Sequence, residues 1–166
     1  MINLAKNIPN IKFSEGTKLC KKNILDFLES ARILIEANRF NHGIIFFQFA
    51  KEEFGKLVWL LNLSKTSDSI ISVPKKVFSS HKSKSKKAED YFGEDLWLIK
   101  GGFDEKGFGK GFEHPIRSDH DIRLKCAFVD YNENNKEWKL GLSYDKEVLS
   151  YSLKRVKDKI ESLIIS

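Results

Sequence analysis

Residues 42–61 read HGIIFFQFAKEEFGKLVWLL and contain the feature that most constrains the fold. Apolar residues recur through the stretch at a density and length that predict one long helix over residues 41–63. The run is interrupted by KEEFGK, in which Lys51, Glu52, Glu53 and Lys56 bring four charges into six residues. A helix of this kind has to place each charge in solvent or give it a partner.

A helical wheel separates the two glutamates of this segment. Glu52 falls near Lys51, Gln48, Gly55 and Trp59, on the side that we expect to be solvated. Glu53 falls about 100° further round the helix, among Phe and Leu side chains, where a carboxylate costs several kcal/mol unless it is paired or protonated.

Lys56 lies three residues after Glu53, at the spacing of a helical ion pair. Two interpretations of Glu53 stay open: a buried ion pair that fixes helix register, or a carboxylate held at a functional site whose partners lie on other helices. Gly55 fits both, because a missing side chain permits the close approach of another helix.

Periodic apolar residues predict further helices. They cover 14–38, a third helix that starts at Pro74 and runs through KKVFSSHKSKSKKAEDYF, and then 115–129 and 145–165. Because the connections between neighbours are short, we expect an all-α, antiparallel, up-and-down bundle that forms one domain over 1–166.

The segments between these helices carry weaker patterns. We expect an irregular lead over 1–13, a connection over 64–74, a Gly-rich connecting loop over 101–114 and a short extended piece at 137–143. The glycine spacing of the loop matches neither phosphate-binding motif of nucleotide-binding proteins.

Composition limits the class of partner. The chain has 166 residues, a net charge of +6 and a pI near 9.2, which favours an acidic partner such as nucleic acid but also suits a soluble surface. Two cysteines suggest a reducing compartment, and neither a signal peptide nor an apolar run of the ~20 residues that span a membrane is present. We therefore expect a cytoplasmic protein that does not contact the membrane.

The lysine-rich third helix offers candidates for chemistry. His81 lies among lysines, of which Lys82, Lys84, Lys86 and Lys87 are candidate RNA-binding residues. The patch is either a solvated helix face or a phosphate-binding surface, in which His81 would transfer protons.

Arg123, on the fourth helix, is either a surface residue or a donor to a phosphate that gains charge. The four histidines lack zinc-site spacing, so we expect no metal and no cofactor.

Three segments in order, NRFNHGIIFFQFAKEEFGK, FSSHKSK and RLKCAFVDY, resemble the AbiV family of abortive-infection proteins within the HEPN superfamily. The resemblance implies a HEPN-like bundle of about five helices, a homodimer and a role in antiphage defence. Many HEPN relatives are metal-independent ribonucleases in which a 2′-hydroxyl attacks the adjacent phosphate. One departure is clear: the Arg and His that usually lie close together on one helix are absent, since Arg117 and His120 lack that spacing.

Any active site is therefore expected to be composite, built from Glu53 and Lys56 on the second helix, His81 on the third and Arg123 on the fourth. The first hypothesis is an endoribonuclease toxin that acts on RNA and blocks translation. The rival is a non-catalytic HEPN module that binds a phage-encoded activator or the host translation machinery. A small-ligand sensor is a third class, indicated only by the Gly-rich loop.

Overall fold

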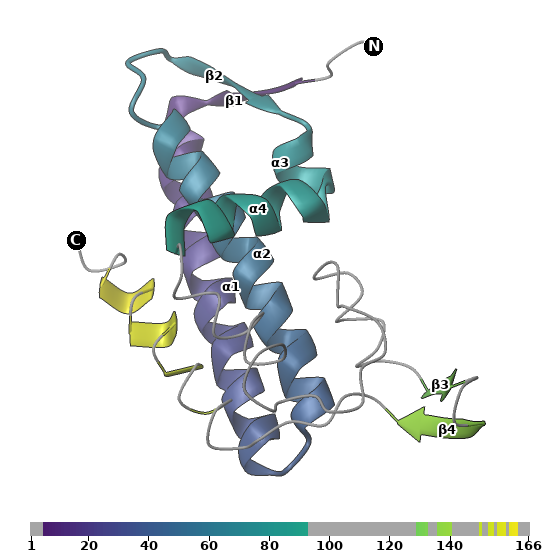
Figure 1. Ribbon diagram of the computed structural model, residues 1–166. Coiled ribbons are helices and arrows are strands. Elements are labelled where there is room, and N and C mark those ends of the chain that lie inside the picture. The colour runs from purple at the N-terminus through teal and green to yellow at the C-terminus, as the bar shows by residue number, and fades with distance from the viewer. Residues whose placement is uncertain are drawn as a thin grey trace.

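The computed structural model describes residues 5–92, 129–132 and 136–140, together with positions 150, 153–154, 156–158 and 160–162 of a C-terminal helix. Two long helices form its frame: α1 spans Asn10–Glu36 and α2 spans Phe40–Leu63. They run antiparallel as a helical hairpin (Figure 1). Both were predicted, although α1 begins four residues before the expected boundary at 14.

The turn of the hairpin is set by Asn38, which adopts a φ of 58° directly after the C-cap Ala37. Asn tolerates this left-handed conformation better than most residues, and it commonly ends a helix in this way. The predicted stop at Asn38 is confirmed.

The β1 strand, Ala5–Pro9, and the β2 strand, Ile70–Pro74, pair antiparallel with Ile8 opposite Ile71. This corrects two predictions, the irregular lead over 1–13 and the connection over 64–74. In β2 the buried residues Ile71 and Val73 alternate with exposed ones, as expected for a strand with one covered face. The alternation is only five residues long, and Pro74 ends the strand where we expected it to open a helix.

The predicted third helix is two helices. The short α3 spans Lys76–Ser79 and α4 spans His81–Phe92, with Ser80 between them at φ −99° and ψ 104°. The Ser80 hydroxyl oxygen accepts a hydrogen bond from the Ser83 N–H at 3.2 Å. Ser80 is therefore the N-cap of α4, because a serine side chain satisfies an N–H that the first helical turn leaves free. Figure 1 shows α4 lying across α2.

The second half of the chain is described in part. The β3 strand, Val129–Asn132, pairs antiparallel with β4, Glu137–Leu140. This confirms the extended piece over 137–140 and makes Val129 a strand residue rather than the last residue of the fourth predicted helix. The rest of that helix, with Arg123, and the Gly-rich loop at 101–114 lie outside the described residues.

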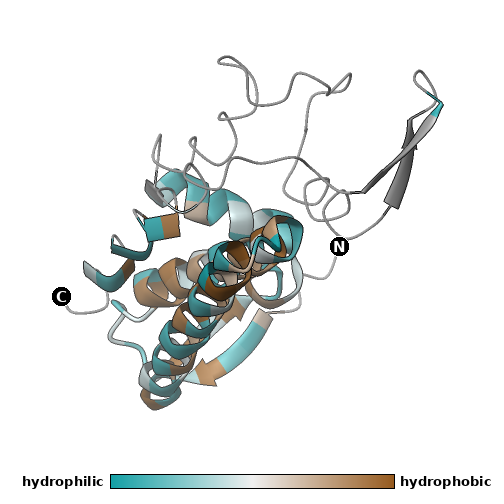
Figure 2. Ribbon diagram, turned by 90° about the horizontal axis from the view of Figure 1, so that it is seen from below, coloured by the Kyte–Doolittle hydropathy of each residue, from teal (hydrophilic) through white to brown (hydrophobic). Residues whose placement is uncertain are grey.

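The described positions of the final predicted helix are helical, and Leu153, Val156 and Ile160 are buried in the core. The core also contains the apolar stripe of α1, including Ile24 and Leu28. Figure 2 shows apolar residues on the sides of the helices that face one another and polar residues on their outer sides. The all-α prediction is confirmed, with two small strand pairs added to it.

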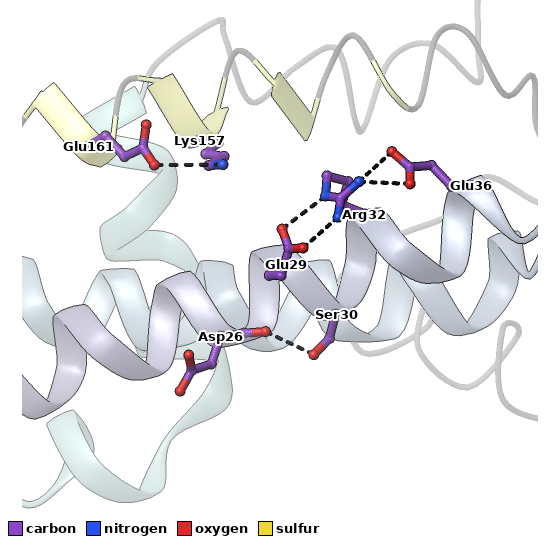
Figure 3. Close-up of polar contacts among 7 residues, drawn as sticks. All are labelled: Asp26, Glu29, Ser30, Arg32, Glu36, Lys157 and Glu161. Carbon is purple, nitrogen blue, oxygen red and sulfur yellow. Dashed lines mark hydrogen bonds and ion pairs between the residues drawn. The ribbon is translucent and has the colours of Figure 1, made fainter.

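The outer face of α1 is polar (Figure 3). Arg32 bridges Glu29 at 2.5 Å and Glu36 at 2.6 Å, and the hydrogen bond from Arg32 lowers the pKa of the Glu29 carboxyl. Lys157, which comes from the C-terminal helix, adds to this lowering. None of the helices that the structure describes is long and apolar enough to cross a membrane.

Candidate functional site

The crossing of α2 and α4 is the closest approach of the two helices, and Gly55 permits it. A Cβ atom at Gly55 would lie 1.9 Å from the backbone oxygen of Lys84 and 2.7 Å from its carbonyl carbon. No side chain fits there unless α4 moves, so the glycine fixes where α4 lies on α2. The interpretation of Gly55 as a point of close helix approach is confirmed.

Glu52 lies one turn before Gly55 and faces α4. Its side chain is only 7% exposed, and one carboxylate oxygen lies 2.5 Å from His81 Nδ1 and 3.7 Å from Lys84 Nζ. His81 begins α4, so the N-cap at Ser80 places the imidazole at the end of the helix that meets Glu52. A buried carboxylate is thus paired with a histidine whose own side chain is 61% exposed.

This arrangement corrects the helical wheel. The face of α2 that we expected to be solvated is buried: Gln48 is 1% exposed, Lys51 4% and Glu52 5%. It is buried because α4 crosses it and supplies partners for its charges. The polar residues of this face are therefore explained by ion pairs with α4. A helical wheel of α2 alone does not distinguish such pairing from exposure to solvent.

A second pair joins the same two helices. Lys51, with a side chain 2% exposed, contacts the Glu89 carboxylate at 3.0 Å. Adjacent residues of α2 thus carry opposite charges, and each has an opposite charge on α4. The neighbouring Gln48 amide is buried, and neither its nitrogen nor its oxygen has a hydrogen-bond partner in the described structure. The crossing is therefore a polar layer inside an otherwise apolar interface.

Glu53 points to a different side of α2, toward α1. Its carboxylate pairs with Lys56 at 2.6 Å, and the two side chains are 14% and 21% exposed. The predicted ion pair is confirmed, whereas the glutamate of α2 that contacts His81 is Glu52 and not Glu53, the one expected in the composite site. Whether Glu53 and Lys56 act in catalysis stays a prediction.

Cys20 of α1 lies against this pair. Burial, and then the nearby Glu53 carboxylate, raise the pKa of the Cys20 thiol to about 12, so the thiol is protonated and unreactive at neutral pH. The same residues border an open groove of about 490 Å³ between α1, α2 and Phe78. Its lining mixes apolar residues such as Leu19 and Leu60 with charged ones.

The lysines predicted to bind RNA differ in their surroundings. Lys82 and Lys86 are exposed, Lys84 is buried beside Glu52, and Lys87 lies over the ring of Trp59. Both Lys82 and Lys86 thus reach solvent, although the Lys86 ammonium pairs with Asp90 at 3.4 Å. Lys84 instead places its ammonium 3.7 Å from the Glu52 carboxylate.

Sequence reasoning missed Glu52, although Gly55 offered a signal for it. The two residues are three apart and share a face of α2, so a glycine read as a helix contact also places Glu52 in that contact. Arg123, the remaining predicted site residue, lies outside the described residues. Among the described residues, no group of three His, Cys, Asp or Glu side chains is placed to hold a metal ion.

Comparison with known proteins gives one clear relationship. The family model HEPN_AbiV, described as AbiV, matches residues 12–161. No curated protein and no solved structure has significant similarity to this chain. The match covers most of the 166 residues and agrees with the helical bundle. The chain therefore belongs to the AbiV family of abortive-infection proteins with a HEPN domain.

Proposed function

We propose that this protein is an antiphage effector that cleaves RNA without a metal ion, with His81 transferring protons and Glu52 orienting its ring. The observation that carries the proposal is the contact of 2.5 Å between the Glu52 carboxylate and His81 Nδ1. A buried carboxylate behind an exposed imidazole is an arrangement that general acid–base catalysis uses repeatedly.

The dyad selects one tautomer of the imidazole. An ionised carboxylate only accepts hydrogen bonds, so Nδ1 carries the hydrogen and donates it to Glu52. The lone pair is then on Nε2, at the outer end of a side chain that is 61% exposed. The Lys84 ammonium, at 3.7 Å, places a positive charge beside the same carboxylate.

The reaction that suits this group is internal transesterification of RNA. Nε2 accepts the proton of a ribose 2′-hydroxyl as the oxygen forms a bond to the adjacent phosphorus. The bond from phosphorus to the 5′-oxygen breaks, and that oxygen takes a proton from solvent, to which His81 returns the proton it accepted. The products are a cyclic phosphate and a 5′-hydroxyl. Negative charge grows on the phosphate oxygens, and the exposed Lys82 next to His81 is placed to stabilise it. Arg123 is proposed for the same task.

Cleavage is tested directly with total bacterial RNA in EDTA. Wild type is expected to give discrete fragments with cyclic phosphate ends, and His81→Ala to give none. His42→Ala is the matched control, because His42 is also exposed on the described surface but lies at the far end of α2. Absence of cleavage by wild type, even with phage lysate as activator, would contradict the proposal.

The cellular role follows from the same chemistry. Cleavage of RNA needed for translation would make the protein a toxin that stops an infected cell from supporting phage growth. We further propose a homodimer, which the family relationship suggests, and a phage-encoded activator. Light scattering tests the dimer, and a monomer at micromolar concentration would contradict it.

A binding module is the second candidate function. Its support is that the two ion pairs between α2 and α4 also serve to fix a helix crossing, and that the chain lacks the usual Arg–His spacing. Such a module would bind a phage or host translation protein. It predicts that His81→Ala keeps toxicity in cells, whereas the ribonuclease proposal predicts that toxicity is lost while the thermal midpoint hardly changes.

A further inference from the structure

Trp59 of α2 contacts both α3 and α4, because one lysine from each of these helices lies over its ring. The Lys76 ammonium is 5.3 Å from the ring centroid and the Lys87 ammonium is 5.1 Å from it. The side chain is partly exposed, whereas its indole nitrogen is buried and has no hydrogen-bond partner in the described part of the chain. Two cations and an aromatic ring thus meet at a surface that solvent reaches.

A second ring at this end of the molecule has the same kind of neighbour. Lys6 of β1 lies 4.9 Å from the ring centroid of Phe78, which belongs to α3. Phe78 is also partly exposed and borders the groove beside α1. Aromatic rings interleaved with lysines are the composition that proteins use to bind single-stranded nucleic acid, where bases stack and phosphates are neutralised.

The Trp59 cluster lies close to the Glu52–His81 dyad. Glu52 and Trp59 are seven residues apart, so they share the face of α2 that α4 covers and are separated by roughly 10 Å along the helix axis. Lys76 and His81 lie on either side of Ser80, which joins α3 to α4. Stacked nucleotides follow one another at about 3.4 Å and extended ones at more, so a strand would reach from the ring to the dyad within roughly three nucleotides.

We infer that Trp59, Lys76 and Lys87 form a subsite for one unpaired nucleotide of the RNA strand that the dyad cleaves. The base stacks on the indole, and the two lysines move from the ring to the flanking phosphates. An unpaired nucleotide is favoured over a duplex because only an unpaired base exposes a face for stacking. The inference rests on the proposed function for the strand's position, and it adds the requirement that the strand be unpaired about three nucleotides from the cut.

Binding is measured in a His81→Ala background, so that the RNA stays intact. A fluorescein-labelled oligouridylate and a labelled RNA duplex of equal length are titrated by fluorescence anisotropy. Trp59→Leu is expected to weaken binding of the single strand by about 10-fold, within the range for loss of one stacked base, and to leave duplex binding unchanged. Trp59→Phe keeps a ring and is expected to lose less.

Matched controls separate stacking from loss of packing and of charge. Phe46→Leu removes a partly buried ring that packs on Phe27 and Phe49, on another side of α2, and should bind like the parent. Lys76→Gln with Lys87→Gln should make the dependence of log affinity on log salt shallower by roughly 0.7 per lysine. Lys12→Gln with Lys18→Gln removes the same charge from α1 and should leave the slope unchanged. Should Trp59→Leu fail to fold, Trp59→Phe and the paired lysine variants still carry the test.

The outcomes distinguish this inference from the proposed function. Selective loss of single-strand binding in Trp59→Leu supports the subsite, even if wild type cleaves nothing. Equal binding of the two RNA forms, unchanged binding by a folded Trp59→Leu, or no RNA binding at all would overturn the subsite. Cleavage by wild type that Trp59→Leu leaves unchanged would overturn it too, and would leave the proposed ribonuclease intact.

Discussion

Glu52 and Glu53 are neighbours in the sequence but lie on two sides of α2 with different consequences. Glu52 faces α4, is 7% exposed and has partners 29 and 32 residues away, His81 and Lys84. Glu53 faces α1, is 14% exposed and pairs within its own helix with Lys56. The contacts of Glu52 therefore depend on the position of α4. Glu53 has its partner, Lys56, in the same helix, so their pair does not depend on another helix.

The difference shows what holds α4 in place. On the α4 side, Gly55 lets the two backbones come close. The charged pairs on this side, Lys51 with Glu89 and Glu52 with Lys84, form in only one register of the two helices. The α1 side has an apolar stripe, a close approach at Gly43, where a Cβ would lie 3.1 Å from the Ala31 backbone oxygen, and an ion pair within α2 that sets no register between helices. We therefore expect changes of Gly55 and of the charged pairs on the α4 side to affect both stability and the dyad, and a change of the Glu53–Lys56 pair on the α1 side to affect neither strongly.

The largest effect is expected for Gly55→Ala. The new Cβ would meet the Lys84 backbone oxygen at 1.9 Å, so α4 has to move and the unfolding free energy should fall by about 3 kcal/mol. Gly16→Ala is the matched control in α1, because the nearest atom to its Cβ is Leu60 Cδ1 at 4.0 Å. That variant should be stabilised by about 0.5–1 kcal/mol. Equal midpoints in urea for both variants would contradict the close crossing.

The next effect separates the two glutamates themselves. Glu52→Gln leaves the buried Lys84 charge without its carboxylate and should lower the unfolding free energy by about 2 kcal/mol. Glu53→Gln should cost about 0.5 kcal/mol, because Lys56 keeps access to water. Urea unfolding measures both variants. NMR of the His81 ring should show a change of tautomer only in Glu52→Gln, and a change in Glu53→Gln instead would reverse the two roles.

These variants also indicate how far the sequence predicts the molecule. The apolar spacing of Ile24, Leu28 and Ile35 is long and regular, so α1 and its burial were predictable. The strand Ile70–Pro74 was not, because five residues give too little alternation to distinguish from a loop. The break at Ser80 was also missed. The lysine-rich run contains several serines, and the sequence does not indicate which of them caps a helix.

The assignment of Glu52 to solvent failed for a different reason. A wheel ranks the faces of one helix by polarity and takes the polar face as exposed. On α2 the more polar face is covered by α4, and the aromatic residues Phe46 and Phe49 are only partly buried. The position of a partner helix decides such cases, and a single helix does not contain that information.

An effect of similar size is expected for the second pair, Lys51 with Glu89, and it should be asymmetric. Glu89→Gln leaves Lys51, whose side chain is 2% exposed, as a buried cation and should cost about 2 kcal/mol. Lys51→Met replaces the cation with an apolar chain of similar length, and Glu89, at 29% exposure, is left with access to water, so the cost should be below about 1 kcal/mol. Thermal and urea unfolding of the two variants should rank them in this order, and the reverse order would contradict the burial of Lys51.

The smallest effect near neutral pH concerns Cys20, on the α1 side. Its pKa is raised from 9.0 to about 12 in the folded chain, so the folded state keeps a proton that the unfolded state loses as the pH rises above 9.0. The thiol's contribution to stability is therefore complete below pH 9.0 and declines above it, by at most about 1.4 kcal/mol per pH unit until the folded thiol also ionises.

Comparison with Cys20→Ala isolates this contribution, because Cys126 and the lysines titrate in both chains and cancel. The difference in unfolding free energy between wild type and Cys20→Ala should be constant from neutral pH to 9.0, and should then move against wild type. Glu53→Gln should shift the onset of thiol ionisation in the folded state to lower pH, since the carboxylate raises the pKa. Glu52→Gln should leave it unchanged, because Glu52 faces α4. If Glu52→Gln changed the pH at which the thiol ionises and Glu53→Gln did not, the charge near Cys20 would come from the α4 side of α2. The distinction between the neighbouring glutamates would then not hold.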